Sequence, residues 1–287
     1  IRNTVKATVI LRRIIKSFKP DVIAGCINEL AFSAAGTGIP VLFFAEDDFR
    51  YTWIQGMVVY PLVTEIISPQ SVNVGPFRYK KRSYNGFQKL SYLHPDYFQP
   101  DRTKVMIGEK SYFIIRLVGL NAYHDLNKKG ISDTLLMQII EQLEKYGRVF
   151  ISSEKPLNEK LDRFRLQISP SDMHHYLAFA DLFISDSQSM SVEASMLGTP
   201  NIRISDFTGK VSVLEQLEKQ YSLTNSFRPS EEEAIMNKIQ FLAGNENERS
   251  DIRKRSRMML SEKIDVTGFI VNYLKEYKSR RTLQDGK

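Results

Sequence analysis

Short apolar runs alternate with amphipathic segments along most of the chain, and this pattern predicts strands that alternate with helices. In the first half it predicts helices at 4–18 and 29–36 and strands at 21–25 and 41–45. The same rhythm resumes later, with strands predicted at 112–118, 149–152, 181–185 and 201–204, helices at 133–146, 171–180 and 191–197, and further helices from about residue 230 onward. Such alternation is typical of α/β proteins with parallel sheets.

An irregular stretch interrupts the rhythm. Residues 68–102 are rich in Pro, Gly, Tyr and basic residues and lack clear periodicity, which is typical of a connection between domains. We therefore expect a Rossmann-like domain plus connection at 1–100 and a second Rossmann-like domain, with C-terminal helices, at 101–287. A domain of this kind normally begins with a strand, whereas this sequence begins inside a predicted helix, so we expect the N-terminal domain to be incomplete.

The composition is that of an ordinary globular protein. Hydrophobic residues make up 42% and charged residues 25%, which excludes disordered and fibrous classes. No run approaches the roughly 18 apolar residues that cross a bilayer, and the opening residues lack the apolar centre of a signal peptide. Cys26 is the single cysteine, which suits a reducing compartment. These features predict a cytoplasmic protein.

The net charge of +7 is concentrated in the N-terminal part. Residues 1–100 contain 12 Lys/Arg against 7 Asp/Glu, with the densest basic run at 78–82. This run can be a solvated linker, or it can attract the protein weakly to the inner face of an anionic membrane. The basic residues do not interleave with aromatic residues on one predicted surface, so we expect no nucleic-acid partner.

Residues 174–206 carry the strongest chemical signal. They predict a helix, a buried strand, the polar turn Asp186–Ser189, another helix and another strand. A helix that begins at the carboxyl end of a parallel strand directs its first amides outward and favours an anion. Glu193, early in this helix, can accept hydrogen bonds from the vicinal hydroxyls of a ribose. Because Asp, Ser and Glu also stabilise helix N-termini without any ligand, the residues alone leave a structural role open.

This segment resembles the donor-binding motif of GT-B enzymes, and most closely the DSGGxxEE motif of the non-hydrolysing UDP-N-acetylglucosamine 2-epimerases. The resemblance implies that Ser187, Gln188 and Ser189 hold phosphate groups and that Glu193 binds the ribose. Gln188 and Ser189 replace both glycines of the motif, so they change how closely the backbone can approach a phosphate and add side-chain donors.

Further stretches extend the resemblance over nearly the whole chain. KPDVIAG and GIPVLFFAEDDFR are similar to N-terminal strands of the epimerases, and RLVGLNAYHDLN is similar to their loop with a functional histidine, here His124. The chain also resembles, over nearly its whole length, a bacterial and archaeal family of unknown function within the GT-B superfamily. The motifs that carry this resemblance are RLVGLNAYHD, YGRVFISSE, the paired His174 and His175, SDSQSMSVEASMLGTP, YNG and YLHPDYFQP. The implied fold is α/β, with two Rossmann-like parallel-sheet domains that face a cleft.

The sequence differs from the epimerases at positions where they perform catalysis. The turn Gly25–Asn28 lacks their aspartate, and Asp125 follows His124 where they have an HRREN run. A glycosyltransferase requires less: a base near the acceptor hydroxyl, and positive groups or helix N-termini that stabilise the departing nucleoside diphosphate.

Candidate residues exist for both roles. Glu46 and Asp48, after a predicted strand, are candidate bases. The candidates for stabilising the charge of the leaving group are His124, Arg116 and the Ser187–Ser191 helix start, which includes the hydroxyls of Ser189 and Ser191. The acidic residues can instead form an ordinary surface turn, and His124 can be an ordinary loop histidine. For the pair His174 and His175 two alternatives are open: packing of the helix against the sheet, or exposure to the cleft from the first turn of the helix.

We therefore predict a glycosyltransferase-like enzyme that binds a nucleotide-diphospho sugar, with UDP as the expected carrier, and a glycan or lipid-linked acceptor in polysaccharide or glycoconjugate assembly. An epimerase-like isomerase and a non-catalytic module that binds a nucleotide or glycan remain alternatives. No metal and no tightly bound cofactor are expected, because the sequence contains no HxxxH motif or Cys/His cluster. The oligomeric state is left open.

Overall fold

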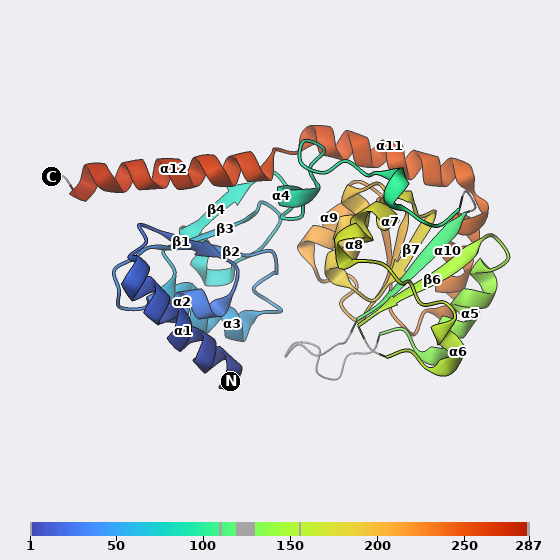
Figure 1. The fold of residues 1–287 in the computed structure, drawn as a ribbon. Helices are drawn as coiled ribbons and strands as arrows, with labels where there is room; N and C mark the ends of the chain where they lie inside the picture. The colour runs from blue at the N-terminus through green and yellow to red at the C-terminus, as the bar shows by residue number, and fades with distance from the viewer. Residues whose placement is uncertain (1, 109–110, 119–129, 155, 286–287) are drawn as a thin grey trace. The chain divides into compact units, whose positions relative to one another are not determined.

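The computed structural model describes residues 2–108, 111–118, 130–154 and 156–285. The chain forms two compact units (Figure 1). The first contains Ile1–Ser91 together with Ile264–Lys287, and the second contains Tyr92–Lys263. Each unit has its own parallel sheet. The predicted fold class, α/β with two Rossmann-like parallel sheets, is confirmed.

The first unit has four parallel strands in the order β1-β2-β3-β4. They are β1 (Ile23–Gly25), β2 (Val41–Phe44), β3 (Glu65–Pro69) and β4 (Lys81–Tyr84). Figure 1 shows three helices on one side of this sheet, α1 (Arg2–Phe18), α2 (Asn28–Ala34) and α3 (Trp53–Val59), the last continued by η1 (Tyr60–Leu62). Val41, Leu42 and Phe43 of β2 are buried, as expected of a strand between two neighbours.

Much of the stretch predicted as a connection belongs to this first unit. After β3 the chain forms η2 (Gly75–Lys80), β4 and the short helix α4 (Leu90–Leu93). Strand β4 pairs in parallel with β3, although its sequence is Lys-Arg-Ser-Tyr. Since β4 lies at the edge of the sheet and buries only Tyr84 of its four residues, it has no apolar run that the sequence could reveal.

The last helix, α12 (Val266–Asp285), also belongs to the first unit, whereas the sequence analysis grouped it with the second. Its Phe269 ring lies 5.4 Å from the ring of Tyr84, centroid to centroid. The hydroxyl of Tyr273 donates to the carboxylate of Glu65 in β3. These long-range contacts determine where α12 packs, and its own sequence does not disclose them. Among the described residues, no helix combines the length and the apolar composition needed to cross a bilayer.

The second unit has five parallel strands in the order β6-β5-β7-β8-β9. They are β5 (Tyr112–Leu117), β6 (Arg148–Ser153), β7 (Leu182–Ser185), β8 (Asn201–Ile204) and β9 (Thr224–Phe227). All four residues of β7 and of β8 are buried, because helices cover both faces of the sheet.

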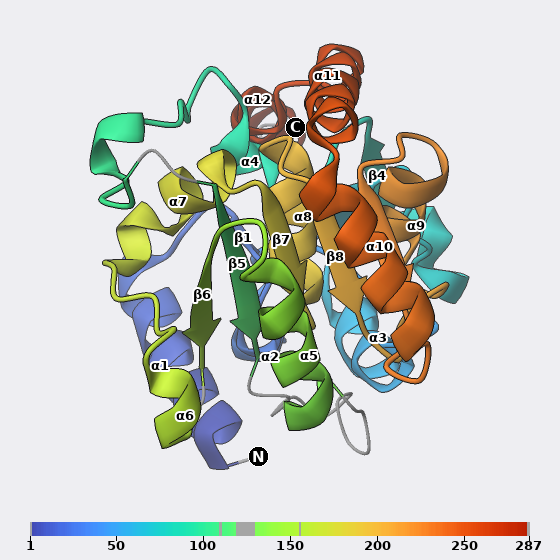
Figure 2. The same ribbon diagram turned by 90° about the vertical axis from the view of Figure 1, so that its right-hand side faces the viewer.

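Seven helices of the described chain surround this sheet, namely α5 (Asp133–Leu143), α6 (Glu159–Asp162), α7 (Met173–Phe179), α8 (Gln188–Met196), α9 (Ser212–Lys219), α10 (Glu232–Gly244) and α11 (Glu246–Glu262). Figure 2 shows α5 and α10 side by side on one face, with α7 and α8 on the other. Short 3-10 turns, η3 (Arg102–Lys104) and η5 (Pro170–Asp172), connect them to the rest of the unit.

Candidate functional site

The second sheet has a switch point between β5 and β7. Strand β5 pairs with β6 on one side and with β7 on the other. The helix that follows β5 and the helix that follows β7 therefore leave toward opposite faces, and a crevice opens between the two strand ends. Ligands of open α/β sheets bind in such crevices. The amide of Val118, just after β5, donates to Asp186 Oδ1, just after β7, at 2.8 Å, and ties the two ends together.

A pocket of about 270 Å³ lies at these strand ends. The polar residues that line it include Asp133, Asn158 and Asp186. Gly130 also borders it, and a Cβ atom there would lie 2.3 Å from Asp186 Oδ2, so only glycine allows this approach. Because carboxylates accept hydrogen bonds, these walls suit a hydroxyl-rich ligand better than a phosphate.

Helix α8 begins beside this pocket, at Gln188, three residues earlier than the sequence analysis predicted. Ser187 is its N-cap, and Ser187 Oγ accepts from the amide of Met190 at 3.3 Å. Within the described part of the chain, the amides of Gln188 and Ser189 have no acceptor. Two N–H donors therefore remain available at the positive end of the helix, as in the anion sites of many α/β proteins.

The side chain of Gln188 turns away from this helix end. Its Nε2 donates to Ser205 Oγ at 2.8 Å, and its Oε1 accepts from a guanidinium nitrogen of Arg203 in β8. Gln188 thus offers its backbone, and not its side chain, to a ligand. No sequence pattern marked Arg203; the available signal was a charged residue between two isoleucines in the predicted strand Asn-Ile-Arg-Ile.

The two other serines of this turn differ in orientation. Ser189 is exposed, so its hydroxyl can reach a ligand at the helix end. Ser191 is fully buried, and its Oγ donates to the carbonyl oxygen of Ser187 at 2.8 Å. The structure therefore places Ser191, a predicted donor-site residue, inside the first turn of α8, where it stabilises the turn and does not face a ligand.

Glu193 lies one turn further along α8 and is held by two side chains. Its Oε1 accepts from the hydroxyl of Tyr92 at 2.7 Å, and its Oε2 lies 3.2 Å from His174 Nε2. The rings of Tyr92 and His174 lie 5.8 Å apart. His174 occupies the first turn of α7, so this carboxylate, phenol and imidazole meet at one place. Tyr92 comes from the irregular stretch and begins the motif YLHPDYFQP, to which the sequence analysis gave no role at the site.

His175 has a different environment from His174. It is buried, its Nδ1 accepts from the amide of Asp101 at 2.9 Å, and its ring lies 4.9 Å from the ring of Phe98. Of the two alternatives that the sequence left open, these contacts favour a packing role for His175.

Arg116, another predicted donor-site residue, extends toward β6. Its Nη1 donates to Ser152 Oγ at 2.7 Å, and its Nη2 lies 2.6 Å from Glu154 Oε1. The guanidinium is therefore neutralised locally, which weakens its attraction for a phosphate. Glu154 is about half exposed, so this pair is open to solvent.

The candidate bases lie in the first unit. Glu46 Oε2 lies 3.0 Å from Lys89 Nζ, and both side chains are largely buried. Asp48 is 5% exposed, and its Oδ1 accepts from the amide of Asn73 at 2.8 Å, so this carboxylate fastens one loop to another. His124 lies outside the described residues. Within those residues, no three His, Cys, Asp or Glu side chains gather as metal ligands.

The fold of this chain is similar to that of several solved structures. The chain is similar to S. aureus MnaA in complex with UDP, with a TM-score of 0.65, 14% identity, and coverage of 96% of this chain and 81% of that one. For UDP-GlcNAc 2-epimerase from Neisseria meningitidis bound to UDP-GlcNAc the values are 0.64, 16%, 95% and 81%. For the spinosyn forosaminyltransferase SpnP they are 0.60, 11%, 95% and 79%.

These identities are low, and the likeness therefore concerns the fold. No curated protein matches the sequence. A family model described as a protein of unknown function, DUF354, matches residues 1–275. This match agrees with the resemblance to a family of unknown function that motifs along nearly the whole chain indicated. The chain belongs to the DUF354 family and has the two-domain GT-B fold that epimerases and glycosyltransferases share.

Proposed function

We propose that this protein is a GT-B glycosyltransferase that binds a nucleotide-diphospho sugar, with UDP as the carrier, and transfers the sugar to a glycan or lipid-linked acceptor. The observation that carries this proposal is the start of α8 at the switch point, where two amides lack acceptors and Glu193 lies one turn away. Two of the similar structures are described as complexes with UDP or UDP-GlcNAc, which supports a nucleotide-sugar ligand.

In this proposal the diphosphate occupies the N-terminus of α8. The amides of Gln188 and Ser189 and the exposed Ser189 hydroxyl donate to its oxygens. Glu193 accepts from the ribose hydroxyls. A carboxylate has about four acceptor positions, so ribose can add to the contacts with Tyr92 and His174 or displace one of them. The pocket with Asp133 and Asp186 is suited to hydroxyl groups of the ligand.

Transfer then requires two further events. A base removes the proton of the acceptor hydroxyl, and the departing nucleoside diphosphate gains charge that the α8 amides stabilise. Glu46 is the proposed base, since it follows the carboxyl end of β2 and its Oε2 lies 3.0 Å from Lys89 Nζ. Asp48 is the less suitable candidate, since it already accepts from Asn73. A role for His124 stays a prediction, and the contact of Arg116 with Glu154 makes it the weaker phosphate ligand.

Epimerisation is less well supported than transfer. The sequence lacks the aspartate after the first strand and the HRREN run that the epimerase resemblance would require. A non-catalytic module would share the nucleotide site but have no acceptor reaction. The two alternatives therefore differ from the proposal in their products, and not in their binding of the nucleotide.

The proposal is tested with a panel of UDP-, GDP- and CMP-sugars. A bound nucleotide sugar should raise the melting temperature in a concentration-dependent manner. Release of nucleoside diphosphate that depends on a glycan or lipid-linked acceptor would identify the transferase. Solvent deuterium at C2 of the sugar would instead identify an epimerase, and binding without turnover would favour the module. If no nucleotide of the panel binds, the proposal is wrong.

A further inference from the structure

A buried cation contacts the side chain of Gln188, the first residue of α8. Arg203 in β8 is 0% exposed. Its Nη1 donates to Oε1 of Gln188, the first residue of the helix, and its Nε donates to Ser226 Oγ at 3.2 Å. Its Nη2 has no acceptor within the described part of the chain. None of the carboxylates described lies within 4.0 Å of this guanidinium, so the cation has only neutral contacts.

Such an arrangement is costly for the protein by itself. Removal of a charged group from water costs several kcal/mol unless an opposite charge compensates it. Burial lowers the pKa of Arg203 to about 10, and more distant attraction by Glu218 and Glu215 opposes this shift. Because this pKa lies far above neutral pH, the side chain remains positively charged. The fold therefore maintains a cation that lacks a neighbouring anion.

Gln188 connects this cation to the N-terminus of α8. Its side chain contacts Arg203, and its backbone amide is one of the two, with that of Ser189, that have no acceptor in the described chain. The helix dipole and the guanidinium both favour negative charge at this turn. Water is excluded from the side of Arg203, so its field is screened less than that of a surface arginine.

We infer that Arg203 is the positioning residue that supplies the countercharge of this anion site, and that it acts through Gln188 to favour a diphosphate over an uncharged ligand. The inference rests on the proposed function in one respect, since it takes the α8 helix end as the place where the diphosphate binds. Beyond the proposed function, the inference names the residue that makes the site prefer charged ligands, and this residue does not itself contact the ligand.

A purely structural role for Arg203 has different consequences. In that case the side chain would serve to connect β8, β9 and α8 through Ser226 and Gln188. Its removal would then lower stability, and any loss of affinity would be equal for charged and uncharged ligands. If Arg203 instead provides countercharge, its removal relieves an uncompensated charge and weakens the binding of anions alone.

The test is Arg203→Met, which retains much of the volume and removes the charge, beside Arg203→Lys, which retains the charge. Affinities for UDP, pyrophosphate and uridine are measured by calorimetry, together with the melting temperature. Arg203→Met should weaken UDP and pyrophosphate by about tenfold or more and uridine by less than about twofold, at an unchanged or higher melting temperature. Arg203→Lys should recover most of the loss. Equal affinity for UDP in Arg203→Met and wild type, or an equal loss for UDP and uridine, would overturn the inference.

Gln188→Glu provides an independent variant in case Arg203→Met fails to fold. It places a carboxylate against the guanidinium at nearly constant shape. We expect a higher melting temperature and weaker pyrophosphate binding, whereas unchanged pyrophosphate binding contradicts the inference. If the wild type binds pyrophosphate but no nucleotide or nucleotide sugar, the proposed function fails and the charge discrimination is still measured with pyrophosphate. If the wild type binds none of these anions, both fail.

Discussion

Asn201 and Arg203 are buried polar residues on the same strand, two positions apart, yet their hydrogen bonding differs. Asn201, at the amino end of β8, donates through Nδ2 to Ser195 Oγ and to the carbonyl of Leu223, at 3.1 and 3.0 Å, and accepts at Oδ1 from Thr224 Oγ1 at 2.6 Å. Arg203 retains an Nη2 group without an acceptor in the described chain. Residues i and i+2 of a strand point to the same face of the sheet, so the two residues do not differ in the face that they occupy. They differ in their position along the strand, since Asn201 lies at its amino end and Arg203 nearer its carboxyl end.

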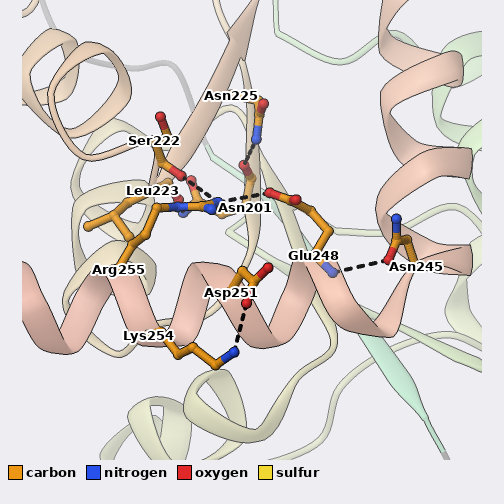
Figure 3. A network of polar contacts seen from close by, with 9 residues as sticks. All are labelled: Asn201, Ser222, Leu223, Asn225, Asn245, Glu248, Asp251, Lys254 and Arg255. Carbon is orange, nitrogen blue, oxygen red and sulfur yellow. Dashed lines mark hydrogen bonds and ion pairs between the residues drawn. The ribbon is translucent and has the colours of Figure 1, made fainter.

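The amino end of the strands is closed by further polar contacts. Figure 3 shows Arg255 of α11 between the carbonyl of Ser222 and Glu248, with Nη2 distances of 3.3 Å and 2.8 Å. Asn225 points toward the backbone of Asn201 in the same view. At this end Asn201 and one nitrogen of Arg255 have protein partners, which serves stability, whereas Nε of Arg255 is buried without an acceptor among the described residues. At the carboxyl end the first amides of α8 and Arg203 keep unused donors, which suits a ligand.

The largest expected effect is on stability at the amino end. Asn201→Leu removes the partner of Thr224 Oγ1 and of the Leu223 carbonyl, so it should lower the free energy of unfolding by about 3 kcal/mol. Urea denaturation measures this change. Asn225→Ala is the matched control, since the amide of Asn225 lies 3.5 Å from its acceptor and should matter little. A loss below about 1 kcal/mol for Asn201→Leu would show that the amino end is not the stabilising region that we describe.

An intermediate effect is expected on affinity at the carboxyl end. Glu193→Ala removes charge-assisted hydrogen bonds to ribose and should weaken UDP binding by more than about 1 kcal/mol, or about fivefold. Calorimetry with the folded variant measures it, and Glu233→Ala, an exposed acidic residue of α10, is the control. Unchanged affinity for UDP would exclude Glu193 from the ribose site.

The smallest effect is expected at Arg255. Its pair with Glu248 is about one-third exposed, so Arg255→Met should lower the free energy of unfolding by about 0.5 kcal/mol and leave UDP affinity unchanged. Lys254→Met, which breaks the more exposed pair with Asp251 in Figure 3, should change it even less. A change in UDP affinity for Arg255→Met would contradict the assignment of ligand binding to the carboxyl end alone.

The net charge also divides unequally. The first unit contains 17 Lys/Arg against 9 Asp/Glu, and the second contains 23 against 24. The excess of positive charge therefore belongs to the first unit. The attraction to anionic membrane surfaces that the sequence indicates stays a prediction, and these counts assign it to that unit.

The sequence allowed the fold class and the anion-binding turn to be predicted because both produce local patterns. Buried parallel strands appear as apolar runs, and a helix after such a strand appears as a polar turn followed by helical periodicity. Tyr92 produces no such pattern, since it meets Glu193 across 101 positions of sequence. Strand β4 was missed because an exposed edge strand needs no apolar run.

The orientation of the α8 serines shows a finer limit of the sequence. Ser189 and Ser191 are two positions apart, or about 200° around a helix, so they face opposite sides once the helix begins at Gln188. The predicted helix began only at residue 191, so Ser189 lay in the preceding turn and Ser191 at the helix start, where each could face a ligand. An error of three residues in a helix start thus reversed the environment of one predicted site residue.

The return of α12 to the first unit has a consequence for biosynthesis. Domains generally fold as units while the chain emerges, with the N-terminal one first. Here Ile264 donates its amide to the carbonyl of Asn85 at 3.0 Å, and Phe269 and Tyr273 then pack against β3 and β4. The contacts between α12 and the first sheet can therefore form only after the whole second unit has been translated. The unit whose translation begins first is thus the one whose contacts are completed last.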